Sequence, residues 1–224
     1  MTKFETIRDR AEKQSGGADK LEERLSQAIV KSPEEIAAMG DDRILSELSL
    51  RVFQSGFNWS VVQKKWPDFE KAFHGFDLGP NIFMSDDEFD EHLKNKGIVR
   101  HAKKILSIRD NAIFLSDLAK EHGSAAAFFA HWPAEDLVEL WDEMKKRGSR
   151  LGGATGQYAL RFLGKESFIL SRDVTTALIS AGVIDKPATS KTALKQVQGA
   201  FNDWKAESGE NMTRLSRILA MSVG

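Results

Sequence analysis

KKRGSRLGGATGQYALRFLGKESFILSRD, residues 145–173, is the stretch that decides the fold. It runs from a basic segment through a glycine-rich turn into an apolar helix and ends on a carboxylate. Glycines at 152, 153 and 156 let backbone N–H groups approach an anion, and a helix that begins there adds the positive end of its dipole. The segment from residue 145 to 165 contains no acid and these cations: Lys145, Lys146, Arg147, Arg150, Arg161 and Lys165. The stretch therefore predicts a hairpin that binds phosphate groups.

An ordinary structural interpretation of the same residues stays open. A Gly-Gly pair after a basic helix end is commonly a C-cap and loop, because the helix dipole favours Lys and Arg there. Asp173 precedes the apolar run VTTALISAGVI, and an Asp in that position is most often an N-cap. A short motif remains a hypothesis until its context agrees with it.

Composition limits the classes of function. The 224 residues carry a net charge of -1, so any binding of nucleic acid must come from a local basic patch. The absence of Cys excludes disulfides, thiolate zinc sites, iron–sulfur clusters and cysteine nucleophiles. The first residues, MTKFETIRDRAEKQ, are too charged for a signal peptide, and no apolar run is long enough to span a membrane. We therefore expect a soluble, cytoplasmic protein.

Apolar residues recur at three- and four-residue spacing along nearly the whole chain, which predicts an all-α fold. We expect about ten helices in two lobes, within a single domain over residues 1–224. N-terminal helices occupy residues 1–35, with a break at 15–17, and C-terminal helices occupy residues 188–224. Pro67 is expected to kink or interrupt the helix in which it lies.

A second informative stretch is LRVFQSGFNWSVVQKKWPDFEKAFHGFD, residues 50–77. The spacing of its aromatic residues indicates packing between helices, and this explains Phe53, Phe69 and Phe73. Trp59 differs, because it follows Gly56, where the chain changes direction and an aromatic face would line a cleft.

Several separated motifs in this chain resemble the 3-methyladenine DNA glycosylase I family. They are QSGFNW (54–59), FHGFD (73–77), GIVRHAKKI (97–105), and KRG with the hairpin that follows it (146–158). The resemblance covers residues 40–182 in collinear order. It implies the all-α fold of the helix-hairpin-helix superfamily of DNA glycosylases, with a helix-hairpin-helix DNA-binding motif.

The resemblance also implies an activity. We expect a DNA glycosylase of base excision repair that flips a damaged, alkylated base out of double-stranded DNA and removes it by hydrolysis. Asp173 stands near the place of the superfamily's catalytic carboxylate, which stabilises an oxocarbenium-like sugar and orients water. Bifunctional relatives carry a Lys where this chain has Gln157, so no strand nicking is expected. No cofactor is expected, and a monomer is the default for such enzymes.

The resemblance places the contacts with DNA as well. The expected phosphate-binding residues are Arg150, Gly152, Gly153, Thr155, Gly156, Gln157, Arg100, Lys103 and Lys104. Trp59, Arg51 and Phe53 are expected to form the base pocket, with Trp59 as the stacking platform. A charge run such as residues 100–104 is otherwise a solvated helix face.

Two departures from the family matter. The family ties its termini together with a zinc clasp of Cys and His, which a chain without Cys cannot form. The family's base-pocket carboxylate falls at Arg51, where a cation would repel the positively charged 3-methyladenine and would instead hydrogen-bond a neutral base with a carbonyl. Alternatively, Arg51 is an ordinary helix arginine paired with Glu47 at i−4.

Two other functions remain open. One is a catalytically inactive DNA-binding or damage-sensing protein on the same scaffold, which Arg51 and the missing zinc site favour. The other is a helical interaction module unrelated to DNA, for which the basic hairpin would be ordinary surface.

Overall fold

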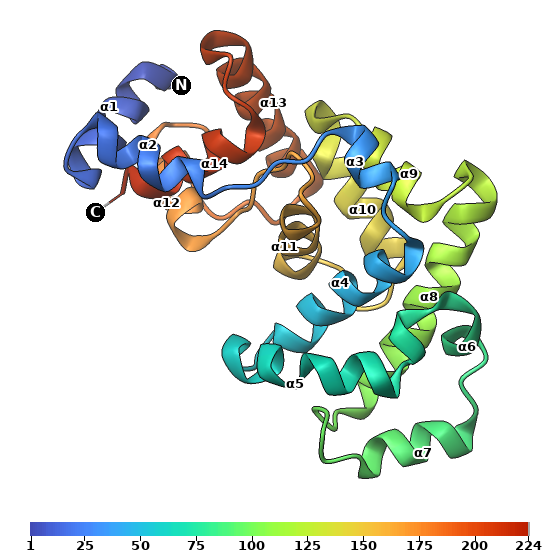
Figure 1. Cartoon of the computed structure of the whole chain (residues 1–224). Helices are drawn as coiled ribbons and strands as arrows, with labels where there is room; N and C mark the ends of the chain where they lie inside the picture. Colours follow the sequence, from blue (N-terminus) through green and yellow to red (C-terminus); the bar gives the residue numbers. More distant parts are fainter. Residues whose placement is uncertain (224) are drawn as a thin grey trace. The chain divides into compact units, whose positions relative to one another are not determined.

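The structure, a computed structural model, describes residues 1–223, and within this range every regular element is a helix (Figure 1). The elements are α1 (Phe4–Ser15), α2 (Ala18–Ser26), α3 (Pro33–Ala37), α4 (Asp41–Gln54), α5 (Trp59–Ala72), η1 (His74–Phe76), α6 (Leu78–Ile82), α7 (Asp86–Lys94), α8 (Ala102–His122), α9 (Ala125–His131), η2 (Ala134–Asp136), α10 (Leu137–Arg147), α11 (Ala154–Leu163), α12 (Arg172–Ser180), α13 (Lys191–Ser208) and α14 (Met212–Met221). The predicted all-α class is confirmed. The expected count of about ten is too low, because helices as short as α3, α6 and α9 show no clear periodicity in sequence.

The chain folds into two compact units that interleave in the sequence. The first unit contains residues 1–31, 132–140 and 166–224, and the second contains residues 32–131 and 141–165. The first unit therefore combines the N-terminal and C-terminal segments of the chain. Residue 173 belongs to the first unit, and the glycine-rich hairpin belongs to the second.

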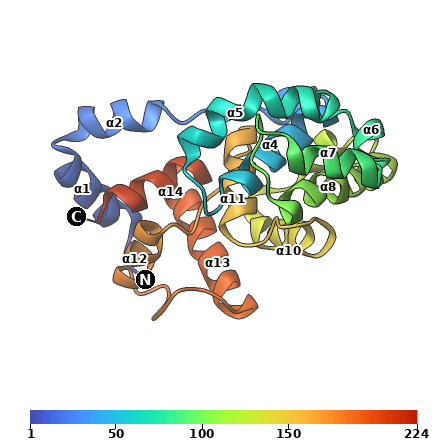
Figure 2. The same ribbon diagram turned by 90° about the horizontal axis from the view of Figure 1, so that it is seen from below.

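The second unit is built on α4, which packs against α5, α8 and α11. Aromatic rings fill its core: Phe53 lies 4.6 Å from Phe69 between ring centres, and Trp66 stacks on Phe69 at 4.7 Å. The indole N–H of Trp66 donates to the Ser46 hydroxyl at 3.0 Å, so its one polar group is satisfied in the core. Helix α5 continues through Pro67 to Ala72. Figure 2 gives a second view of these helices.

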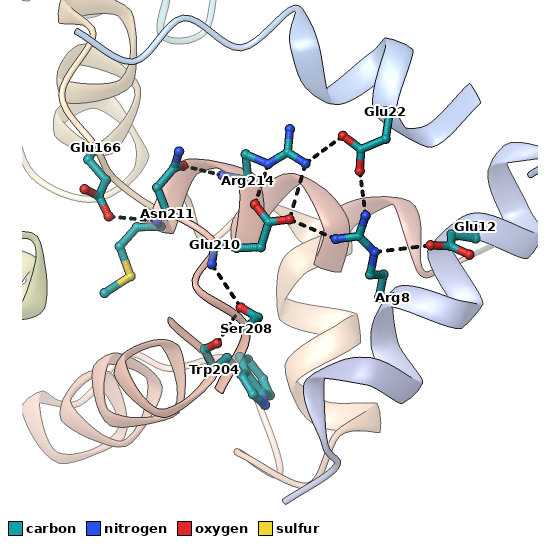
Figure 3. A network of polar contacts seen from close by, with 10 residues as sticks. Arg8, Glu12, Glu22, Glu166, Trp204, Ser208, Glu210, Asn211 and Arg214 are labelled. Carbon is teal, nitrogen blue, oxygen red and sulfur yellow. Dashed lines mark hydrogen bonds and ion pairs between the residues drawn. The ribbon is translucent and has the colours of Figure 1, made fainter. Parts of the chain in front are cut away.

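The first unit is tied together by a network of ion pairs between α1, α2 and the start of α14 (Figure 3). Arg8 contacts Glu12 at 3.2 Å, Glu22 at 2.6 Å and Glu210 at 2.8 Å. Arg214 contacts the same Glu22 at 2.7 Å and the same Glu210 at 2.5 Å. Two arginines thus share two carboxylates, and the network joins residues that lie about two hundred positions apart.

The core of the first unit lies beside this network. Phe168 stacks on Phe201 at 4.1 Å between ring centres, and the buried indole of Trp204 donates to the carbonyl of Thr2 at 3.1 Å. In the described part of the chain, no helix has the length and apolar character needed to cross a bilayer.

Candidate nucleic-acid interface

The glycine-rich stretch forms a helical hairpin, as predicted. Helix α10 ends at Arg147, residues 148–153 form the turn, and α11 begins at Ala154. Arg150 and Gly153 adopt positive φ angles of 62° and 61°, so the turn needs left-handed conformations at two positions. The buried Asn111 of α8 holds this turn: its amide donates to the carbonyl of Ser149 at 3.1 Å and accepts the Ser149 N–H at 2.7 Å.

Close backbone packing explains Gly156. A Cβ atom added there would lie 2.3 Å from the carbonyl oxygen of Leu151, which is closer than any real contact. Gly156 is buried in the first turn of α11, and its absent side chain lets the turn fold back on the helix. It therefore shapes the hairpin rather than presenting a surface.

The N-terminus of α11 is open. Its N-cap is Gly153, which has no side chain to cap with, and among residues 1–223 no acceptor takes the N–H of Ala154, Thr155 or Gly156. These donors and the positive end of the helix dipole form a site for one anionic group, such as a phosphate.

The basic cluster of the hairpin is smaller than the sequence indicated. Lys146 pairs with Asp142 at 2.8 Å, and Arg147 pairs with Glu121 of α8 at 2.7 Å. Lys165 is buried and donates to the carbonyl of Ala130 at 3.1 Å. The pairing acids lie outside the stretch itself, Asp142 one turn earlier on α10 and Glu121 on α8. The exposed cations with no ion pair within residues 1–223 are Lys145 and Arg150.

The expected DNA-binding residues divide by exposure. Arg100 and Lys103 are exposed at the start of α8, where they are free to meet a phosphate. Lys104 and Gln157 are buried, so their expected direct contact with DNA is not supported by their placement. The ammonium group of Lys104 donates instead to the carbonyls of Phe53 at 3.2 Å and Ser55 at 2.5 Å. Burial, and then the charge of Arg150, lower the pKa of Lys104 to about 8.

A pocket of about 140 Å³ opens beside the hairpin, within the second unit. It is lined by Arg51, Gln54, Ser55, Gly56, Trp59, Ala154, Thr155 and Tyr158. Trp59, 42% exposed, meets the Tyr158 ring edge to face at 5.4 Å between centres, and Phe162 stands 6.0 Å from Trp59. The pocket thus joins an aromatic wall to the open end of α11.

Arg51 lines this pocket and also pairs with Glu47 at i−4. Its side chain is 7% exposed. The Nε atom donates to Glu47 at 2.5 Å and Nη1 donates to the Oε1 atom of Gln54 at 2.7 Å. The guanidinium carbon lies 3.7 Å from the centre of the Phe162 ring, an arrangement that holds its plane in place.

One residue expected in the base pocket lies elsewhere. Phe53 is fully buried against Phe69 and is not among the lining residues, because its position on α4 faces the core. Tyr158, which sequence reasoning did not assign to the site, is part of the pocket wall. Three other residues were missed: Gln54, Phe162 and Asn111. For Tyr158 and Phe162, the spacing of four on a helix was the available signal.

Asp173 is the second residue of α12 in the first unit. The cap of this helix is Ser171, whose hydroxyl accepts the N–H of Val174 at 3.2 Å, so the N-cap interpretation of Asp173 is wrong. The Asp173 side chain is exposed and makes no hydrogen bond or ion pair with any residue from 1 to 223. Within the same residues, no group of three or more His, Asp or Glu side chains is placed to hold a metal ion.

Comparison with known proteins identifies the family. Residues 35–150, more than half of the chain, match the family model for methyladenine glycosylases. The chain belongs to the methyladenine glycosylase family. A similar relative is the DNA-3-methyladenine glycosylase of Haemophilus influenzae, 31% identical over 70 residues, which are 31% of this chain and 38% of the relative. The aligned region thus spans less than half of that glycosylase.

Solved structures show the fold over a longer range. The 3-methyladenine DNA glycosylase I of Staphylococcus aureus matches with a TM-score of 0.52 at 20% identity, covering 62% of this chain and 82% of that one. The 8-oxoguanine glycosylase/lyase of Methanocaldococcus jannaschii, solved with DNA, matches with a TM-score of 0.56 at 14% identity, covering 96% and 95%. The resemblance drawn from sequence is confirmed, and the glycosylase-like fold extends beyond residues 35–150.

Proposed function

We propose that this protein is a DNA glycosylase that flips a damaged base from duplex DNA into the pocket and removes it by hydrolysis. The observation that carries the proposal is that Ala154 and Thr155 belong to both sites. They line the pocket, and their N–H groups form the open anion site at the start of α11. A phosphate held there would place its own nucleotide next to the aromatic wall.

The second unit supplies the groups that base flipping needs. Extrusion costs a few kcal/mol, and less for a damaged base. Stacking on Trp59 would return about 1–3 kcal/mol. Phe57 is exposed on the tight turn at Gly56, beside the pocket, and the ammonium group of Lys104 lies 4.5 Å from its ring centre. An apolar side chain in this position suits a wedge that fills the gap left in the duplex.

The chemistry is assigned to Asp173. As the bond between the sugar and the base breaks, positive charge develops on the sugar, and a carboxylate stabilises that charge and orients the attacking water. Water adds to the sugar carbon, and the base leaves with a proton. The unengaged carboxylate of Asp173 is compatible with this role. Gln157, buried and without an amine, cannot form a Schiff base, so the proposal includes no strand nicking.

The relatives are called methyladenine glycosylases, so an alkylated base is the first substrate class to test. That class stays a prediction for this chain, as do its action on double-stranded DNA, its monomeric state and its place in the cytoplasm. A damage-sensing protein without catalysis is the second candidate, because Arg51 stands where the family has its pocket carboxylate.

The experiment is base release from methylated duplex DNA, resolved by chromatography, for wild type and Asp173→Asn. Release that vanishes in the variant, with duplex binding retained, supports the glycosylase and the role of Asp173. Equal release from both proteins overturns that role and keeps the enzyme. Duplex binding without release of any base from a panel of lesions, Asp173 intact, selects the sensing protein. Binding that does not weaken with added salt rules out phosphate contacts and both candidates.

A further inference from the structure

The hydrogen-bond donors of Arg51 are only partly used. Nε is taken by Glu47 and Nη1 gives one hydrogen bond to Gln54, while Nη2 has no acceptor among residues 1–223. A guanidinium group carries five N–H donors and cannot accept. Arg51 lines the pocket, so its remaining donors are available to a ligand there.

Gln54 adds a second donor with a fixed orientation. Because Arg51 can only donate, the amide atom that faces it at 2.7 Å must be the oxygen, Oε1. The Nε2 group of Gln54 therefore points elsewhere, and it has no acceptor within residues 1–223. Gln54 is buried and lines the pocket. The hydrogen bond between the two side chains thus sets two unused donor groups at a fixed spacing.

The positive charge of Arg51 is offset by a neighbouring carboxylate. Glu47 accepts from Arg51 at 2.5 Å, and the pair is nearly buried, with 7% and 19% of the two side chains exposed. Phe162 at 3.7 Å and Trp59 at 5.5 Å hold the guanidinium plane. A guanidinium group paired with a carboxylate presents N–H groups without much net charge. This side of the pocket therefore suits a neutral ligand with acceptor atoms better than an anion.

We propose that the pocket selects a neutral purine that carries a carbonyl oxygen at O6 and an unsubstituted ring nitrogen at N7. Hypoxanthine in DNA is the test case. The proposal rests on the proposed function and names the substrate class of the same site. Arginine recognises these two adjacent acceptors on guanine, and hypoxanthine presents the same pair. Pyrimidines lack a second acceptor on that edge. Guanine itself shares the edge, but normal pairing and stacking oppose its extrusion, whereas a mispaired base leaves the duplex at lower cost.

The same donor groups of Arg51 and Gln54 disfavour damaged bases derived from adenine. The exocyclic amine of 3-methyladenine would meet the N–H groups of Arg51 and Gln54 donor to donor, and no free carboxylate lines the pocket. A 7-alkylated guanine lacks the ring-nitrogen acceptor and carries positive charge. Both classes of alkylated purine are therefore expected to bind more weakly than hypoxanthine.

The test uses the full chain and two readouts. The first is calorimetric binding of the free bases hypoxanthine and 3-methyladenine. The second is release of hypoxanthine from a duplex with one such base, and of 3-methyladenine from methylated duplex. Hypoxanthine is expected to bind at least tenfold more tightly and to be the base released. Gln54→Glu keeps the hydrogen bond to Arg51 but removes the amide donor, so it should weaken hypoxanthine binding about tenfold without unfolding the protein.

Arg51→Met is the stronger variant and should abolish the preference, with its thermal melt checked first. Tighter binding of 3-methyladenine by wild type overturns this inference and leaves the glycosylase proposal intact. Failure of wild type to bind either free base also overturns it. Binding of hypoxanthine without release from any duplex supports the pocket assignment and argues against the enzyme. Unchanged hypoxanthine affinity in both variants means that Arg51 and Gln54 do not read the base, and the inference fails.

Discussion

Asn111 satisfies both polar groups of the Ser149 backbone, through hydrogen bonds of 3.1 and 2.7 Å. The amide of this one buried side chain thus supplies the hydrogen bonds that a neighbouring helix or strand backbone would otherwise supply to the turn. Because Asn111 lies in the middle of α8, the longest helix of the second unit fixes the turn that leads to the open end of α11. The proposed phosphate site therefore depends on a residue outside the hairpin.

Asn111→Leu is expected to destabilise the protein by about 2–4 kcal/mol, because it leaves two backbone groups of Ser149 without partners. It should also weaken binding to undamaged duplex DNA, since the turn would no longer hold α11 in place. Urea unfolding and a DNA titration measure the two effects. Asp110→Ala, at an exposed neighbouring position on α8, is the control and should change neither. If the two variants have the same stability and the same DNA affinity, the conformation of the turn does not depend on Asn111.

Gly156→Ala should destabilise the hairpin by about 1–3 kcal/mol, because the new methyl group would lie 2.3 Å from a backbone oxygen that cannot rotate away. The matched control is Gly199→Ala in α13, where a Cβ would meet nothing within 4 Å. There the better helix propensity of alanine should stabilise the protein by about 1 kcal/mol. Thermal melts of both variants check the opposite signs. A loss of stability in both would point to a general intolerance of substitution.

Much of the fold could be predicted from sequence because its signals are local. Glycines at 153 and 156 reflect backbone requirements of the turn, and the cap at Ser32 is a complete capping box in the structure. Helical periodicity depends only on neighbouring residues. Helical periodicity did not predict short helices such as α9. Their side chains are buried by contacts with distant segments, which a local pattern does not contain.

The candidate site was harder to predict, because its residues act through partners far away in sequence. Lys104 belongs to a run of cations that is typical of an exposed helix face. It is nevertheless buried, and its ammonium group donates to backbone carbonyls at the end of α4. Arg147 counts as a free cation until Glu121 is placed beside it. Tyr158 and Trp59 meet only once α11 packs on α4. Charge runs and lone aromatics therefore predicted the composition of the site better than its geometry.

Lys104 predicts a specific dependence of stability on pH. Burial and the charge of Arg150 lower its pKa to about 8 in the folded protein, against 10.5 for an unperturbed lysine. Between these two values the unfolded chain binds more protons, so the free energy of unfolding should rise with pH from about 8 to 10.5. Lys104→Met should lack this rise, although it also loses the two hydrogen bonds to the turn. Urea unfolding of both proteins at pH 7.5, 9 and 10.5 measures the difference in slope. Parallel curves would mean that Lys104 titrates normally.

Glu210 and Arg214 belong to the network that joins α1, α2 and α14 (Figure 3). The network ties the helices near the N-terminus to α14 near the C-terminus. Burial acts to raise the pKa of Glu210, but the hydrogen bonds and charges of Arg214 and Arg8 outweigh it and hold the pKa below its usual range. A carboxyl with a lowered folded pKa stabilises the protein above its unfolded pKa, near 4.5. That stabilisation is lost as the pH falls through the folded value.

Glu210→Gln should therefore destabilise the protein at pH 7 by about 2 kcal/mol, because Arg8 and Arg214 lose a shared carboxylate in a partly buried site. The difference from wild type should shrink as the pH is lowered below 4.5, where wild type loses the same charge. Chemical unfolding at pH 7 and at pH 3 checks both statements. The exposed pair of Lys94 and Glu91, at 2.9 Å, supplies the control, since Glu91→Gln should cost less than about 0.5 kcal/mol at either pH. A Glu210→Gln variant as stable as that control at pH 7 would show that the network does not hold the termini together.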